Sequence, residues 1–107
     1  MTAEEFKKLA LAMPNTIAKP HFDRMAYKVL NKRIFATLHE ATNSTNLKLS
    51  QIDQSVFCSF NKTMVYAVPN KWGLQGWTTF ELDALPEEFV QDALNIAYGE
   101  ALAPKGK

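Results

Sequence analysis

The sequence predicts an α+β fold in which helices from both ends of the chain cover one face of an antiparallel sheet. Three observations predict this fold. Apolar residues recur with a helical period near each end, they alternate with a period of two in between, and short polar turns separate the alternating runs. Strands joined by connections this short pair as antiparallel neighbours. We therefore expect a two-layer α+β sandwich that forms one domain over residues 1–107.

The first helix is predicted over residues 3–12. Thr2 and Glu5 form a capping box, in which each side chain accepts a hydrogen bond from the other residue's backbone amide. An apolar stripe follows at helical spacing, and Pro14 ends the helix. The residues of this stripe are Phe6, Leu9, Ala10 and Met13.

From Lys19 the apolar period changes to two, which predicts a hairpin. Asn31-Lys32 is its expected connection, because asparagine tolerates a positive φ. A polar turn at 42–45 then leads to a third strand. The residues expected to share a face within each strand are Met25, Tyr27 and Val29, then Ile34, Ala36 and Leu38, then Leu47 and Leu49.

The second half of the chain predicts a short helix, two strands and a final helix. Ser50 is the expected N-cap of the short helix, and the strands span 64–68 and 77–82. Pro86 and the two acidic residues after it suit the first turn of the final helix. The expected core lies between the terminal helices and the sheet and consists of Phe6, Leu9, Met13, Ile34, Leu38, Leu82, Phe89, Ala93 and Leu94.

The segment 68–78 concentrates aromatic and turn-forming residues. It holds both tryptophans, two of the four glycines and one of the five prolines. We expect an ordered loop with Gly73 or Gly76 at positive φ and Trp77 packed against the turn. Several strand positions are apolar on both faces, so this loop is expected to cover part of the second face of the sheet.

Composition restricts the class of protein. Twelve basic and eleven acidic residues give a net charge of +1, so there is no overall attraction to nucleic acid or anionic lipid. The single Cys58 rules out an internal disulfide and fits a reducing compartment. The sequence shows neither a signal-peptide pattern nor an apolar run of about 20 residues. We expect a cytoplasmic monomer that does not associate with membranes.

Few residues suggest catalysis or metal binding. Cys58 would need His21 or His39 as its base, but its apolar neighbours favour a buried, unreactive thiol. His21 with Asp23, and His39 with Glu40, lack the paired spacing of a zinc site. No phosphate-binding glycine loop is present. The sequence therefore predicts no enzyme activity, no cofactor and no metal.

Basic residues gather locally in the first predicted hairpin. Lys71 and Trp72 are expected at the tip of the second hairpin, where a cation beside an exposed aromatic ring can bind phosphate and stack on a base. The alternative is a solvated strand surface with Trp72 folded onto the sheet, which the near-zero net charge favours. The basic residues of the first hairpin are Lys19, His21, Arg24, Lys28, Lys32 and Arg33.

The segment 20–28, PHFDRMAYK, resembles the Pro-x-Phe-Gly-Arg-x-x-Phe/Tyr-Lys/Arg entry of the MmcQ/YjbR family. The resemblance continues through 32–38, like that family's KIFATL strand, then through 47–50, 68–78 and the final helix. It spans essentially the whole chain in order. Asp23 departs from it, because glycine is common at that position.

This resemblance implies a CyaY-like fold and a double-wing motif suggested to bind DNA. The wings would be the hairpin near Asn31-Lys32 and the hairpin that carries 69–76. Frataxin relatives of the fold bind iron through an acidic first helix. Here two lysines balance Glu4 and Glu5, so we do not expect iron binding.

Two hypotheses follow. In the first, the protein binds DNA through the basic hairpin, Lys71 and Trp72. In the second, it is a ligand- or protein-binding module with an aromatic pocket under the 69–77 loop. Cations clustered on one surface would favour the first, and a concave aromatic pocket the second. The residues expected to line that pocket are Tyr27, Phe35, Trp72 and Trp77.

Overall fold

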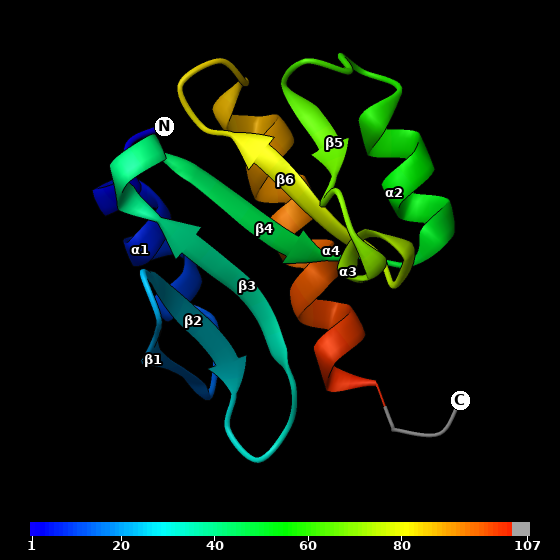
Figure 1. The fold of residues 1–107 in the computed structure, drawn as a ribbon. Coiled ribbons are helices and arrows are strands. Elements are labelled where there is room, and N and C mark those ends of the chain that lie inside the picture. The colour runs from blue at the N-terminus through cyan, green and yellow to red at the C-terminus, as the bar shows by residue number, and fades with distance from the viewer. Residues whose placement is uncertain (104–107) are drawn as a thin grey trace.

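The computed structural model describes residues 1–103 and confirms the predicted α+β class (Figure 1). Its six strands form one antiparallel sheet in the order β1-β2-β3-β4-β6-β5. The strands are β1 (Thr16–His21), β2 (Arg24–Val29), β3 (Ile34–His39), β4 (Ser44–Lys48), β5 (Val65–Ala67) and β6 (Trp77–Glu81). The helices are α1 (Ala3–Leu11), α2 (Gln51–Cys58), α3 (Lys71–Leu74) and α4 (Glu87–Leu102), with a 3-10 turn η1 (Glu40–Thr42).

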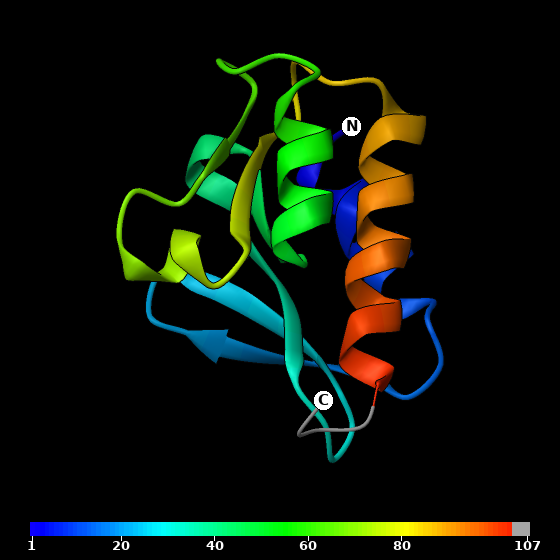
Figure 2. The same cartoon turned by 90° about the vertical axis from the view of Figure 1, so that its right-hand side faces the viewer.

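Helices α1 and α4 pack on the same face of the sheet, as predicted, and α2 joins them there. Figure 2 shows α4 on one side of the sheet and α3 on the other. The capping box of α1 is present, with the Glu5 amide donating to the Thr2 hydroxyl at 3.1 Å and the Thr2 amide donating to the Glu5 carboxylate at 2.8 Å. None of the helices within residues 1–103 is long and apolar enough to cross a membrane.

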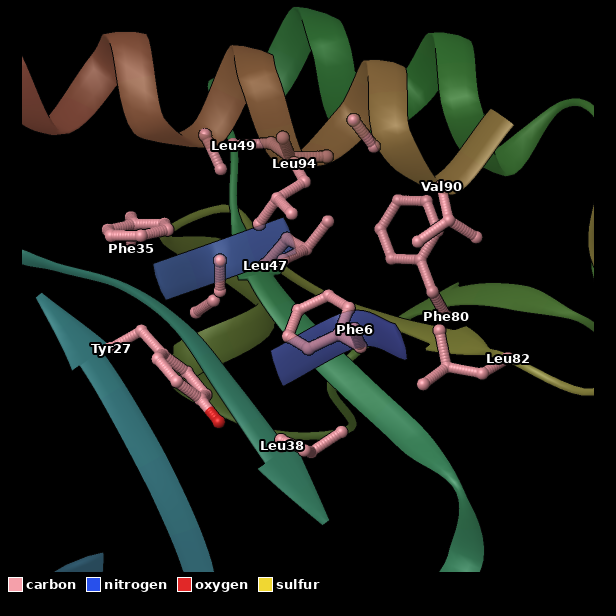
Figure 3. Close-up of a cluster of buried hydrophobic side chains, with 14 of the residues drawn as sticks. Phe6, Tyr27, Phe35, Leu38, Leu47, Leu49, Phe80, Leu82, Val90 and Leu94 are labelled. Carbon is pink, nitrogen blue, oxygen red and sulfur yellow. The ribbon is translucent and has the colours of Figure 1, made fainter. Parts of the chain in front are cut away.

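The core fills the space between these helices and the sheet (Figure 3). Its aromatic rings meet edge to face: Phe6 lies 6.1 Å from Tyr27 and Phe57 lies 5.9 Å from Phe80, measured between ring centroids. Of the expected core, Phe6, Leu38, Leu82, Ala93 and Leu94 are buried, whereas Leu9, Met13 and Phe89 are partly buried against it. Ile34 was wrongly assigned to the core.

A β-bulge explains the position of Ile34. Tyr27 pairs with Ala36 while Lys28 pairs with Ile34, so Phe35 is an extra residue in β3. Phe35 therefore lies on the core face together with Ala36, and Ile34 is shifted to the opposite face. The simple alternation expected for this strand fails at this bulge.

Strand β1 and helix α3 are additions to the predicted elements. The sequence predicts alternation only from Lys19, yet β1 begins at Thr16 and pairs with β2 along its whole length. Its residues are mostly exposed, so it carries no apolar pattern. Pro20 is tolerated because β1 is an edge strand, where one row of amides needs no partner.

The turns largely follow the predicted chemistry. Asn31 has a φ of 63° in the β2–β3 turn, and Gly76 has a φ of 107° just before β6. Within the 69–76 loop, the Asn70 side chain caps α3 by accepting a hydrogen bond from the Trp72 backbone amide at 2.8 Å. Gly73 sits so close to the Val68 carbonyl that a β-carbon there would lie 1.9 Å from its oxygen.

Candidate functional site

A pocket of about 300 Å³ lies on the side of the sheet opposite α1 and α4. One wall comes from the ends of β1 and β2, and the other comes from the 69–76 loop, with strand residues forming the floor between them. Half of its lining is apolar or aromatic, which suits a flat organic ring. The lining residues are His21, Arg24, Ile34, Thr37, Asn46, Val68, Trp72 and Trp77.

Strand pairing determines which side chains surround this pocket. Directly paired residues of neighbouring strands point to the same side of a sheet. We call the side opposite α1 and α4 the open face. One row across it is Lys19, Ala26, Thr37, Asn46 and Thr79, and a second is formed by the pairs Ile17–Lys28, Lys28–Ile34 and Lys48–Trp77.

Two hydrogen bonds fix the polar floor of the pocket. Arg24 Nη1 donates to Thr37 Oγ1 at 3.5 Å, and Thr79 Oγ1 donates to Asn46 Oδ1 at 2.7 Å. Because Asn46 accepts through its oxygen, its amide nitrogen remains as a donor, and this nitrogen has no hydrogen bond within residues 1–103. The pocket thus offers a cation and an amide donor beside apolar walls.

Tyr27 and Phe35 were wrongly assigned to this pocket. Both are buried on the core face, with exposed fractions of 1% and 0%. Tyr27 shares that face with Met25 and Val29 by strand alternation, and the bulge brings Phe35 to it. Trp72 and Trp77 do line the pocket, and the Trp72 side chain is half exposed.

The basic residues of the sequence divide into two groups. Lys19, Arg24 and Lys28 lie on the open face, while Lys32 and Arg33 lie in the β2–β3 turn. Arg33 Nη2 donates to the Ala103 carbonyl oxygen at 2.7 Å, at the C-terminal end of α4. The arginine is therefore occupied in stabilising that helix end. His21 lines the pocket, and exposed Lys71 begins α3.

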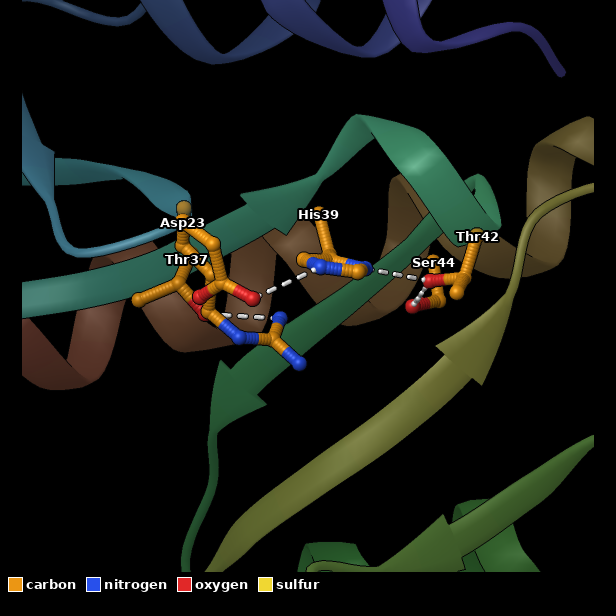
Figure 4. A network of polar contacts seen from close by, with 6 residues as sticks. Asp23, Thr37, His39, Thr42 and Ser44 are labelled. Carbon is orange, nitrogen blue, oxygen red and sulfur yellow. Dashed lines mark hydrogen bonds and ion pairs between the residues drawn. The ribbon is translucent and has the colours of Figure 1, made fainter.

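The acidic side chains near the open face already have partners. Asp23 Oδ2 lies 2.9 Å from His39 Nε2, and His39 Nδ1 lies 2.7 Å from Thr42 Oγ1 (Figure 4). The Glu81 carboxylate accepts a hydrogen bond from the Tyr66 hydroxyl, which raises the pKa of Tyr66, and burial adds to this effect. Glu81 and Tyr66 both point to this face through their pairing with β4 and β6.

The cations of the open face, by contrast, are not neutralised by nearby carboxylates. Within residues 1–103, the salt bridges involve Lys7 and His39 as the basic partners. Lys19, Arg24, Lys28 and Lys48 make none there. The open face therefore carries more unpaired positive charge than the net charge of +1 suggests.

The sequence indicates only part of this site. Lys48 could be placed from its alternation with Leu47 and Leu49, which belong to the core. Thr37 and Asn46 could not, because their proximity to Trp77 depends on how β3, β4 and β6 pair. The exposed ring of Phe22, in the β1–β2 turn outside this pocket, was also missed, since nothing in the sequence predicts its φ of 59°.

The arrangement does not favour nucleophilic or metal chemistry. Cys58 packs against the core at the end of α2, whereas His21 and His39 lie on the other side of the sheet. In the part of the chain from Met1 to Ala103, no three histidine, cysteine or acidic side chains are grouped to hold a metal ion. Burial raises the pKa of the Cys58 thiol, which reduces the thiolate fraction at neutral pH.

We expect Cys58 in the native protein to react more slowly with iodoacetamide than Cys58 in urea-unfolded protein at the same pH. The thiolate is the reacting species, and burial disfavours it in the folded state only. The native rate should keep rising beyond the ordinary thiol range of about pH 8.5. Mass spectrometry of quenched time points measures both rates. A faster native reaction at neutral pH would contradict this prediction.

Comparison with known proteins identifies a similar fold and no sequence family. No family model matches the chain, and no curated protein does so. The fold is similar to the crystal structure of the Deinococcus radiodurans protein DR2400, described as a DUF419 domain. The TM-score is 0.77 at 20% identity, covering 91% of this chain and 75% of that chain. At this identity the likeness shows the fold alone.

Proposed function

We propose that this protein binds DNA through the open face, and that it is a member of the MmcQ/YjbR family. The observation that carries the proposed function is the placement of four unneutralised cations around a pocket walled by both tryptophans. Cations supply the sequence-independent attraction to phosphates, and aromatic rings supply stacking surfaces for bases. The cations are Lys19, Arg24, Lys28 and Lys48.

Two observations support family membership. The segments 20–28, 32–38 and 68–78 resemble the family in order and spacing. In the structure they form the β1–β2 turn with β2, strand β3, and the loop that contains α3, so the matching segments surround the pocket. The departure at Asp23 has a local reason, because the positive φ of this turn falls on Phe22.

The proposed interface differs from the wings implied by the resemblance. Arg33 binds the end of α4, so we leave the Asn31-Lys32 turn out of the interface. The strand surface of β1 to β4 replaces it, with the 69–76 loop at one border. Lys48, which the sequence did not suggest, joins the interface, and Lys71 is retained at its border because it begins α3.

We expect DNA binding to be modest and strongly dependent on salt. About four phosphate contacts imply a slope of roughly −3 to −4 for log Kobs against log salt concentration on duplex DNA. Replacing Arg24 and Lys28 together with alanine should flatten this slope by about two units. Fluorescence anisotropy titrations of labelled DNA at several salt concentrations measure both slopes.

The matched control is the double variant Lys8→Ala and Lys62→Ala. It removes the same charge from α1 and from the α2–β5 turn, away from the open face. Its slope should stay at the parent value if the open face binds the phosphates. Equal slopes for the two double variants would contradict the proposed interface. Absence of binding at low salt and high micromolar protein would contradict DNA binding itself.

The pocket supports a second candidate function, the binding of a small anionic ring compound. A volume of about 300 Å³ lies at the lower end of ordinary ligand sites, and Arg24 would face a carboxylate or phosphate on such a ligand. The two functions differ in their salt dependence. One charged contact gives a shallow salt dependence, whereas several phosphate contacts give a steep one.

A further inference from the structure

We infer that the pocket of the open face holds one unpaired base, so that the protein prefers single-stranded over duplex nucleic acid. This inference rests on the proposed function and names the part of the nucleic acid that the site takes. Trp72 would stack on the base, Asn46 would hydrogen-bond to its edge, and Arg24 would lie near an adjoining phosphate.

Trp72 is positioned before any ligand binds. It lines the pocket and is 51% exposed, so much of its indole is free to receive a ring. Its backbone is held by the Asn70 cap, and the close approach of Gly73 to Val68 anchors α3 beneath it. Because the backbone that carries the ring is already held, stacking on the ring requires little further ordering of the chain.

The floor of the pocket offers a donor to an unpaired base. The Thr79 hydroxyl donates a hydrogen bond to the side-chain oxygen of Asn46 at 2.7 Å, so the Asn46 amide nitrogen remains free to donate to a ligand. The carbonyl oxygens on the pairing edge of thymine accept such hydrogen bonds. In a duplex that edge is occupied by the complementary base and stacked within the helix. Access to this floor therefore requires a base that has left the stack.

The surrounding charges fit a strand that passes across the pocket. Arg24 lines it, Lys28 pairs with Ile34, and Lys48 pairs with Trp77, and both of these partners line the pocket too. The carboxylates of Asp23 and Glu81 on this side are hydrogen-bonded to His39 and Tyr66 and, in the part of the chain that the structure describes, form no ion pair with these cations. Backbone contacts from these cations would keep a base at the mouth of the pocket.

The test compares a thymidine oligomer of about twelve nucleotides with an abasic oligomer of the same length and phosphate number, and with a duplex of that length, which carries about twice as many phosphates. We expect the thymidine oligomer to bind about 5- to 150-fold more tightly than the abasic one. The chain has two tryptophans and both line the pocket, so quenching of their emission reports occupancy directly. The thymidine oligomer should quench this emission and the abasic oligomer should not.

A pair of variants on α3 assigns the preference to the indole. Trp72→Ala should remove the advantage of the thymidine oligomer over the abasic oligomer. Leu74→Ala, which truncates an exposed side chain of the same helix outside the pocket, should preserve the advantage. The comparison of DNAs on the parent protein does not depend on either variant folding.

The outcomes separate the two proposals. Equal affinity for the thymidine and abasic oligomers, or tighter binding of the duplex, would overturn the base pocket and leave DNA binding through the cations intact. Failure of all three DNAs to bind would overturn both proposals. Tighter binding of the thymidine oligomer with quenching, both lost in Trp72→Ala, supports the base pocket.

Discussion

Replacing Gly76 with alanine is expected to lower the free energy of unfolding by about 2–4 kcal/mol. Gly76 has a φ of 107°, where side chains are rarely tolerated, and a β-carbon there would lie 1.7 Å from the Leu49 carbonyl oxygen. The two residues are also linked, because the Leu49 amide donates to the Gly76 carbonyl at 3.0 Å. The chain cannot relieve the clash without breaking this bond and moving the start of β6. Urea unfolding followed by circular dichroism measures the loss.

Gly99→Ala is the matched control. Gly99 lies in α4, and a β-carbon there would meet no atom within 4 Å. Alanine should therefore stabilise the helix by about 0.5–1 kcal/mol, because glycine loses more backbone entropy on folding. Opposite shifts of the two urea midpoints are expected. Shifts in the same direction would show that the turn at Gly76 relaxes easily.

The turn at Gly76 also connects stability with the site. Trp77 follows Gly76 directly and lines the pocket. Its backbone carbonyl accepts a hydrogen bond at 3.0 Å from the amide of Val68, which also lines the pocket. A displaced turn would shift both pocket residues together. We therefore expect any folded Gly76→Ala protein to show altered tryptophan emission, whereas Gly99→Ala should keep the parent spectrum.

Local signals in the sequence were sufficient for the class of fold and most of its elements. The capping box at Thr2, the period of the terminal helices and the asparagine turn at Asn31 each depend on neighbouring residues alone, and each is present in the structure. Strand β1 was missed because an exposed edge strand has no apolar alternation to reveal it. Its pairing with β2 is a tertiary property.

The site was harder to predict because it depends on pairing between strands. The bulge at Phe35 exchanges the faces of Ile34 and Phe35, and alternation within one strand cannot reveal it. Phe35 was placed in the pocket for this reason, and Tyr27 was placed there although alternation puts it on one face with Met25 and Val29. Thr37 and Asn46 were not considered. Aromatic residues can pack on either face, and the face is decided by which strand lies opposite.

Leu94→Ala is expected to cost about 2–5 kcal/mol of unfolding free energy. Leu94 is fully buried between α4 and the sheet, where Figure 3 shows it near Leu47 and Leu49. Truncation removes apolar contacts and leaves a cavity that α4 cannot close without tilting its other buried residues out of place. Urea unfolding measures the change through the shift of the midpoint.

Two further leucines calibrate this loss with the same chemical deletion. Leu102 lies near the end of α4 with 43% exposure, so Leu102→Ala should change stability by no more than about 0.5–1 kcal/mol. Leu9 is partly buried in α1 against the core, so Leu9→Ala should fall between the two. This order follows from burial, because helix propensity favours alanine equally at all three positions. If Leu94→Ala lost no more unfolding free energy than Leu102→Ala, the packing of α4 on the sheet would be contradicted. The sheet that forms the open face would then lack the helix layer that supports it from behind.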